Sequence, residues 1–227
     1  FKNKKFQKIQ KYFSDSDTYI RKAAYQSTGK IYFGNEKLRS NIINVLEKLL
    51  KEENSYIRQT VINSAGEIGI KYFPDIKHLL EKGLSDAHHS VRNAVIGSLK
   101  KICEKNPEAS LPFIKSYLHH PDAEIRREMC HGLELRGRTH PQDILPLLKE
   151  LQFKKVARVR NTLVHVIGQI AYKKGCLEKV IAHLKTWENK EVVNKSLDEI
   201  IIVHERYKNF SAYTTAEAKA VIKEYFS

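Results

Sequence analysis

The sequence predicts an all-α fold, an α-α superhelix of about six helical hairpins with a closing helix at the carboxyl end. Three observations predict it: a fixed period, apolar residues at helical spacing, and short polar turns between them. The period is set by six β-branched residues, called anchors here, and the last four intervals between them are each 34 residues. The anchors are Ile20, Ile57, Val91, Ile125, Val159 and Val193.

An amphipathic helix is predicted to run through each anchor. Apolar residues mostly follow the anchor at four, eight and eleven positions, as Val95, Leu99 and Ile102 do in the third repeat. These spacings keep to one face of an α-helix, so the anchor face is expected to be buried. At the eleventh position the fourth and sixth repeats differ, with Arg136 and His204.

A second apolar stripe precedes each anchor and predicts the first helix of the hairpin. In the second repeat it contains Leu46 and Leu50, eleven and seven positions before the anchor. In the fifth and sixth repeats the residue seven positions before the anchor is polar (Gln152 and Thr186). The adjacent Leu151 and Trp187 are expected to take its place in the core. The polar turn between the two helices carries residues such as Asp122, whose side chain can accept hydrogen bonds from the amides that begin the next helix.

Glycine, asparagine and proline mark the boundaries between repeats, because they suit a helix end or the first turn of the next helix. Thr214 and Glu217 form a capping-box pattern before a last apolar stripe. We therefore predict a single continuous domain, with a repeat array over residues 1–207 and a capping helix within 208–227 that covers the last repeat. The predicted repeats span residues 1–35, 36–70, 71–104, 105–138, 139–172 and 173–207.

An arginine directly follows five of the six anchors, and an acidic residue often stands before the anchor in the turn. The arrangement is clearest where Asp86 precedes Val91 by five positions and Arg92 follows. This pattern, which extends over residues 4–207, resembles the HEAT-repeat family of armadillo-like α-solenoids. The resemblance implies a structural ladder between the arginines and the carboxylates of the turns, and a row of phosphate contacts is the alternative. The arginines are Arg21, Arg58, Arg92, Arg126 and Arg160.

The outward positions of the second helices form the candidate binding surface, because the resemblance implies that second helices line the concave side of the array. Amide and basic side chains dominate the positions two and six residues after each anchor, and the only carboxylate there is Glu199. Such side chains can donate hydrogen bonds to phosphates or to a partner's carbonyls. An ordinary solvated groove is the alternative. The residues predicted to bind, called the binding stripe here, are Lys22, Gln59, Asn93, Arg127, His131, Asn161, His165 and Lys195.

The chain is strongly basic, with a formal net charge of +14 at pH 7. A balance of this kind favours an anionic macromolecular partner, either nucleic acid or an acidic protein segment. A solvated, lysine-rich surface is the alternative. The binding stripe has no aromatic side chain on which bases could stack, which argues against single-stranded nucleic acid.

The densest group of ionisable residues lies in the fourth repeat, where Arg127, His131 and Glu134 recur at helical spacing. A histidine beside a carboxylate can act as an acid–base pair, and an ion-pair network between repeats is the alternative. In size, basic charge and helical repetition the chain also resembles the HEAT-like alkylpurine DNA glycosylases. That resemblance implies aromatic residues, notably tryptophan, around a damaged base, whereas the single Trp187 lies on a predicted first helix. We therefore expect a non-catalytic scaffold, with a DNA-binding repair enzyme as the alternative.

No metal site and no cofactor are predicted. The sequence contains neither Cys-x-x-Cys nor His-Glu-x-x-His, and the adjacent pairs His88-His89 and His119-His120 point to different faces of a helix. Three widely separated cysteines argue against a disulfide framework and for a reducing compartment, so we expect a cytoplasmic protein. No apolar run is long enough to cross a membrane, and no membrane partner is expected.

Overall fold

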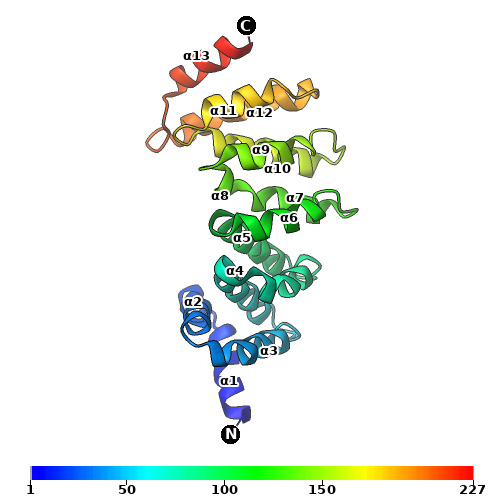
Figure 1. The fold of residues 1–227 in the computed structure, drawn as a ribbon, viewed down its shortest axis with the longest axis vertical. Helices are drawn as coiled ribbons and strands as arrows, with labels where there is room; N and C mark the ends of the chain where they lie inside the picture. The colour runs from blue at the N-terminus through cyan, green and yellow to red at the C-terminus, as the bar shows by residue number, and fades with distance from the viewer. Residues whose placement is uncertain (1, 227) are drawn as a thin grey trace. The chain divides into compact units, whose positions relative to one another are not determined.

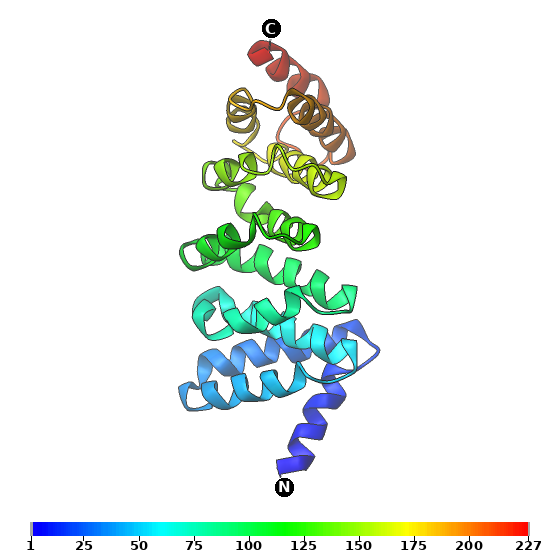
Figure 2. The same ribbon diagram turned by 90° about the vertical axis from the view of Figure 1, so that its right-hand side faces the viewer.

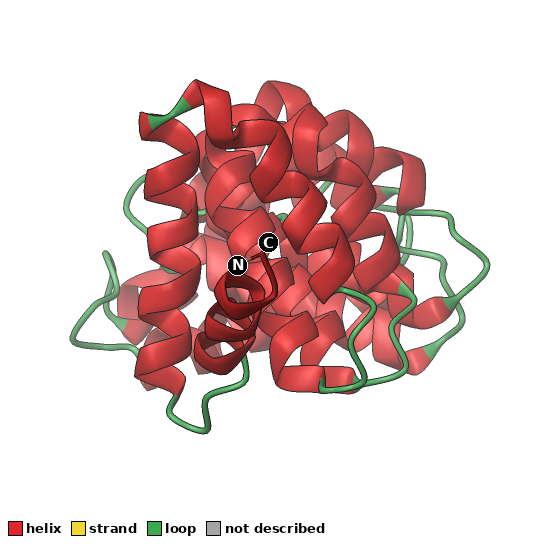
Figure 3. Cartoon of the chain, turned by 90° about the horizontal axis from the view of Figure 1, so that it is seen from below, coloured by secondary structure: helices red, strands yellow, loops and turns green. Residues whose placement is uncertain are grey.

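The chain folds into helices and the segments that connect them. The computed structural model describes residues 2–226, and no strand occurs among them (Figures 1 and 3). The prediction of an all-α fold is confirmed. None of the helices in this range combines the length and the apolar character that a membrane span requires. The elements are α1 (Lys2–Phe13), α2 (Thr18–Gly34), the 3₁₀ turn η1 (Glu36–Leu38), α3 (Arg39–Leu49), α4 (Ser55–Leu84), α5 (His89–Lys105), α6 (Pro107–Tyr117), α7 (Ala123–Gly132), α8 (Glu134–Gly137), α9 (Pro141–Lys149), α10 (Ala157–Ala171), α11 (Leu177–Leu184), α12 (Lys190–Arg206) and α13 (Thr215–Phe226).

The helices form two compact units, Phe1–Leu111 and Pro112–Ser227, and the boundary between them falls inside α6. Within each unit successive hairpins lie side by side (Figure 2). In the first unit α2 packs on α4 and α4 on α5, and in the second unit α7 packs on α10 and α10 on α12. These are the predicted second helices of successive repeats. That the whole array is a single domain remains a prediction.

Two predicted helices are merged in α4, with a kink between them. Its first part is the second helix of the second repeat, and its last part is the first helix of the third repeat. The backbone leaves helical angles at Tyr72 (φ −123°, ψ 57°), two residues before Pro74. Proline lacks an amide hydrogen and suits the first turn of a helix, so the break falls beside a proline, one of the residues expected to mark the boundaries between repeats.

The anchors lie in the core in five of the six repeats. Leu151 and Trp187, expected where the stripe of the first helices slips, are also buried, at 0% and 1% exposed. The three cysteines are buried thiols that are not joined in a disulfide. A core that continues from hairpin to hairpin is the main source of stability in such a stack. The buried anchors are Ile57, Val91, Ile125, Val159 and Val193.

The first repeat departs from this pattern, and the burial predicted for Ile20 is wrong. Ile20 and Ile31 are 38% and 50% exposed, and they line an open apolar groove of about 1350 Å³ between α1, α2 and α3. Helix α2 instead presents Gly29 to α4, where a Cβ would lie 2.7 Å from the Cβ of Glu67. Because this close approach fixes the rotation of α2, the anchor face of the helix is directed to the groove.

The five arginines that follow the anchors bind the turn of their own hairpin. In each case Nη1 donates to main-chain carbonyl oxygens five or six residues earlier, and for Arg126 these belong to His120 and Pro121, at 2.6 and 2.8 Å. The carboxylate expected as partner is seen at Arg58, which also binds Asp86 in the next turn. Carbonyl groups are available in a turn of any sequence, which explains why the arginine contact recurs where the acidic residue does not.

The closing helix begins with the predicted capping box. The main-chain amide of Thr214 donates to Glu217 Oε2 (2.8 Å), and the amide of Glu217 donates back to Thr214 Oγ1 (3.2 Å). These bonds satisfy two amides that would otherwise lack an acceptor at the start of α13. The helix packs on α11 and α12 and buries Ala218 completely.

Candidate functional site

The members of the binding stripe differ in how accessible they are. Lys22 on α2, Asn93 on α5 and Asn161 on α10 are exposed. Gln59 on α4 is half-buried, and its side-chain nitrogen lies 3.5 Å from the carbonyl oxygen of Ser90, which joins two successive hairpins of the first unit. The exposed members are available to a partner, whereas Gln59 has a structural contact as well.

Two basic members of the stripe are engaged in ion pairs on their own helices. Arg127 donates from Nε (3.0 Å) and Nη2 (2.6 Å) to Glu124 Oε1, and its side chain is only 17% exposed. Lys195 lies 2.7 Å from Glu191 but keeps 55% of its side chain exposed. The hydrogen bond from Arg127, opposed by partial burial, holds the pKa of the Glu124 carboxyl below its usual value. Arg127 is therefore less available to an anionic partner than Lys195.

Three members of the stripe in the second unit share one open hollow. His131 on α7 and Asn161 and His165 on α10 line it, and its volume is about 560 Å³. Arg158 and Thr162 complete the lining, and neither was predicted. Both lie on the same face of α10 as Asn161 and His165, since residues three, four and seven apart are neighbours on a helix. That spacing is the signal in the sequence that would have identified them.

Every side chain that lines this hollow can donate a hydrogen bond, and none is a carboxylate. Arg158 is 68% exposed and uses Nη1 to donate to Glu124 Oε2 (2.8 Å), so that Glu124 links α7 to α10. A guanidinium has five donors, and one ion pair leaves others for a ligand. The hollow is suited to a group that accepts hydrogen bonds, such as a phosphate or a carboxylate.

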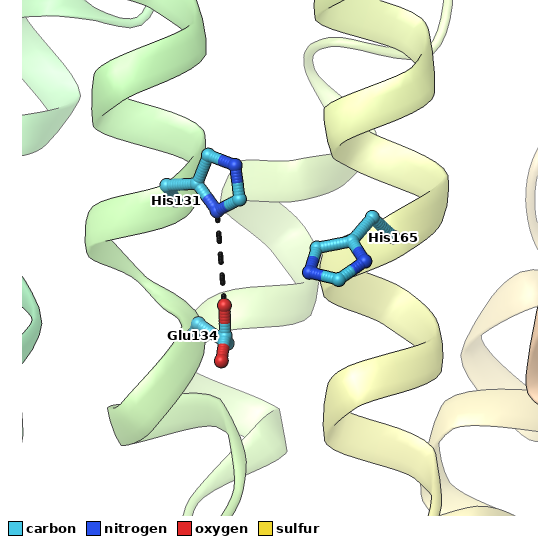
Figure 4. A group of neighbouring side chains, drawn as sticks. All are labelled: His131, Glu134 and His165. Carbon is cyan, nitrogen blue, oxygen red and sulfur yellow. Dashed lines mark ion pairs between the residues drawn. The ribbon is translucent and has the colours of Figure 1, made fainter. Parts of the chain in front are cut away.

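The group of ionisable residues predicted in the fourth repeat is only partly assembled. His131 on α7, Glu134 on α8 and His165 on α10 converge, as Figure 4 shows, and one possible ligand atom from each lies within 4.8 Å of the others. Nδ1 of His131 is 3.7 Å from Glu134 Oε2, which is too long for a hydrogen bond. Arg127 binds Glu124 and is not part of this group. The predicted acid–base pair is therefore not formed as a hydrogen-bonded unit.

The second oxygen of Glu134 belongs to an ion pair. Arg138 Nη2 donates to Glu134 Oε1 (2.6 Å) and also to Gln169 Oε1 on α10 (2.7 Å). Glu134 is 4% exposed, so the arginine provides the charge partner that a buried carboxylate needs. The ion pair lies within the fourth repeat, and the hydrogen bond from Arg138 to Gln169 connects it to the fifth repeat.

Other candidates from the sequence lie apart from this group. His88 is an exposed cap at the start of α5, and His119 Nε2 lies 2.8 Å from Glu150 at the surface. Trp187 is buried, and its Nε1 donates to His183 Nδ1 (2.8 Å). The tryptophan is therefore part of the core of the second unit and is not positioned to stack on a nucleobase.

Comparison with known proteins supports the repeat assignment. Residues 6–100 match the family described as HEAT repeats. No curated protein matches the chain. Among solved structures, smu.31 from Streptococcus mutans UA159 is similar, with 17% identity, a TM-score of 0.63, and coverage of 84% of this chain and 96% of that one. AlkD2 from Streptococcus mutans is also similar, with 16% identity, a TM-score of 0.63, and coverage of 86% and 96%. At these identities the likeness establishes the fold alone.

Proposed function

We propose that this helical-repeat chain, whose residues 6–100 match HEAT repeats, is a non-catalytic scaffold which binds an anionic macromolecule through the outward side chains of its second helices. The observation that carries the proposal is the hollow on α7 and α10, which is lined by five donor side chains and no carboxylate. Three of the five are stripe residues from two successive repeats. A repeat protein recognises extended partners by repeating such contacts along its surface.

Charge supports an anionic partner. The chain carries +14 at pH 7, and the exposed side chains of Lys22, Arg158 and Lys195 belong to second helices or their first turns. Basic groups of this kind attract phosphates or acidic side chains over a distance set by the ionic strength. The amides of Asn93 and Asn161 add donors that carry no charge and that orient a partner once it has bound.

Charge reversal on the second helices tests the proposal. We expect the double variant Arg158→Glu, Lys195→Glu to bind about tenfold or more weakly, since like charges across an interface cost several kcal/mol. The measurement is fluorescence anisotropy with a labelled duplex DNA and with a labelled glutamate-rich peptide. The matched control is Lys115→Glu, Lys185→Glu, which makes the same change in net charge on α6 and at the end of α11.

The control decides between a located surface and a general effect of charge. The proposal requires the control variant to bind nearly as well as the unaltered chain. Equal losses in the two double variants would show that net charge alone drives binding and would contradict it. If only one of the two probes binds, that probe identifies the chemical class of the partner.

A DNA-binding repair enzyme of the alkylpurine glycosylase type is the second candidate. The likeness in fold to AlkD2 favours it, whereas the burial of Trp187 and the lack of a Trp, Tyr or Phe side chain in the hollow do not. Release of a base from methylated duplex DNA, lost in His131→Ala, would support the enzyme in place of the scaffold. Binding without base release leaves the scaffold as the function.

A further inference from the structure

We propose that His131, Glu134 and His165 form a binding site for one divalent transition-metal ion, for which zinc is the best-suited probe. The site lies within the second unit, and it stands or fails independently of a macromolecular partner. The sequence predicts no metal site, because His131 and His165 lie on different helices and belong to no short metal-binding motif. His131 and His165 are one period of 34 residues apart, and they occupy equivalent positions on successive second helices.

The geometry brings three ligand atoms of suitable chemistry together. One atom from each residue lies within 4.8 Å of the others. Figure 4 shows that a ring nitrogen of His165 faces His131 and Glu134 while its other nitrogen faces away. The nitrogen that faces away is Nδ1, which lies 3.7 Å from Glu199 Oε1, so Nε2 is directed to the site. Zinc bonds of about 2.0–2.2 Å would draw these atoms closer.

An atom inside the group lacks a hydrogen-bond partner. His131 Nδ1 is buried and makes no hydrogen bond, and Glu134 Oε2 is 3.7 Å away. A buried polar atom without a partner has lost its hydrogen bond to water with nothing in return, which is unfavourable. A metal ion between His131 and Glu134 would satisfy this nitrogen and use the carboxylate oxygen that faces it.

A second layer of residues orients the ligands. Arg138 holds Glu134 Oε1 at 2.6 Å and leaves Oε2 directed toward His131. Glu199 on α12 lies beside Nδ1 of His165. Histidine ligands of metals characteristically contact a carboxylate or a carbonyl through the other ring nitrogen, which fixes the tautomer and the ring orientation. The hydrogen bond from Arg138 is in place without the ion, whereas Glu199, at 3.7 Å, would have to move closer to Nδ1 of His165 to accept a hydrogen bond.

Close helix packing fixes the backbone of this site. A Cβ on Gly137 at the end of α8 would lie 2.4 Å from Ile170 Cδ1 on α10. A Cβ on Gly168 would lie 2.7 Å from Glu199 Cγ on α12. The two glycines therefore permit α8, α10 and α12 to approach, which places Glu134 beside His165 and Glu199 behind it. A site built on packed helices is held more firmly than one built on loops.

The donor set and the access to solvent agree with a zinc site that keeps an open position. Two imidazoles and one carboxylate are a set that zinc accepts when a fourth position is left for water or a ligand. His131 and His165 also line the open hollow, so the fourth position would face it. The nearby Cys130 thiol is buried and is not among the three residues whose ligand atoms converge, so it is not counted among the ligands.

Calorimetric titration of the chelator-treated chain with zinc tests the site. We expect one zinc ion to bind per chain. His131→Gln and His165→Gln should each weaken binding by about tenfold or more, since even the loss of a supporting residue costs 10–100-fold. Glu199→Gln should weaken it about tenfold for that reason. Cobalt in place of zinc should give the visible absorption bands of a four- or five-coordinate ion in the unaltered chain and not in the two histidine variants.

The matched control is His140→Gln, which removes an exposed histidine of the same unit, and it should bind zinc like the unaltered chain. Circular dichroism and thermal unfolding establish that each variant is folded. The proposal is overturned if the unaltered chain binds no zinc, or if the double variant His131→Gln, His165→Gln binds zinc with unchanged affinity. In the first case an ordered water in place of the ion would satisfy His131 Nδ1.

Discussion

Replacing Trp187 with alanine is expected to lower the free energy of unfolding by about 3–5 kcal/mol, because removal of a buried aromatic side chain leaves a cavity. Trp187 is 1% exposed and follows α11, where it fills the position at which the apolar stripe slips. Its Nε1 also donates to His183 Nδ1 (2.8 Å). Urea denaturation followed by circular dichroism measures the loss.

The conservative change Trp187→Phe separates packing from the hydrogen bond. It keeps an aromatic ring in the core but removes the donor to His183, so a smaller loss of about 1 kcal/mol is expected. If the Trp187→Ala variant were as stable as the unaltered chain, the side chain of Trp187 would not contribute to the packing of the sixth repeat. Equal losses in both variants would assign the stability to the hydrogen bond.

Replacing Arg58 with methionine is expected to cost about 3 kcal/mol, because it leaves a largely buried carboxylate without its charge partner. Arg58 binds Asp86 through Nε (2.7 Å) and Nη2 (2.9 Å), and their side chains are 15% and 9% exposed. Its Nη1 donates to the carbonyl oxygens of Glu52 and Glu53 (2.8 and 2.7 Å). The variant loses both the ion pair and the hydrogen bonds to the turn. Urea denaturation measures the resulting decrease in the free energy of unfolding.

The stability contributed by the ion pair between Arg58 and Asp86 should decrease at acid pH. Burial would raise the pKa of the Asp86 carboxyl, but the hydrogen bonds from Arg58 and from the amide of His88 outweigh it and hold the pKa below the ordinary 3.8. The stability from this pair is therefore complete above about pH 4 and is lost as the pH falls through the folded-state pKa. The difference between the unaltered chain and Arg58→Met should shrink in that acidic range.

Arg160→Met is the matched control for Arg58→Met. Arg160 occupies the same position in the fifth repeat, and its Nη1 donates to the carbonyl oxygen of Lys155 at 3.1 Å. The Arg160→Met change should lower the free energy of unfolding by only about 1 kcal/mol, the net contribution of one hydrogen bond. If both arginines cost the same at neutral pH, the ion pair with Asp86 contributes nothing beyond the contact with the turn.

Much of the fold could be predicted because the period and the helical spacing reflect contacts that every repeat makes. Val91 and Val159 are buried for the same reason, which is contact with the neighbouring hairpins of their own unit. The burial predicted for Ile20 is wrong because the close approach of α2 to α4 at Gly29 directs the face of Ile20 to an open groove. The kink at Tyr72 could be predicted from Pro74, since the effect of proline on a helix is local.

The candidate site was harder to predict, because side-chain rotamers and ion pairs decide which groups are free. Arg127 has the spacing of a binding residue, yet it binds Glu124 on its own helix. Arg158 directly precedes the anchor Val159 and is not part of the binding stripe, yet it lines the hollow. The convergence of His131, Glu134 and His165 follows from helix packing at Gly137 and Gly168, which depends on contacts between repeats that spacing along one helix does not reveal.

The dependence of binding on salt tests the central claim, an anionic partner on the second helices, most directly. Anisotropy titrations of the chain with duplex DNA or a glutamate-rich peptide should be repeated across a series of salt concentrations. For DNA the logarithm of the binding constant should fall linearly with the logarithm of the salt concentration, with a slope of about −0.9 for each phosphate neutralised. The slope should be shallower in Arg158→Glu, Lys195→Glu than in Lys115→Glu, Lys185→Glu. A binding constant that does not change with salt would contradict the account.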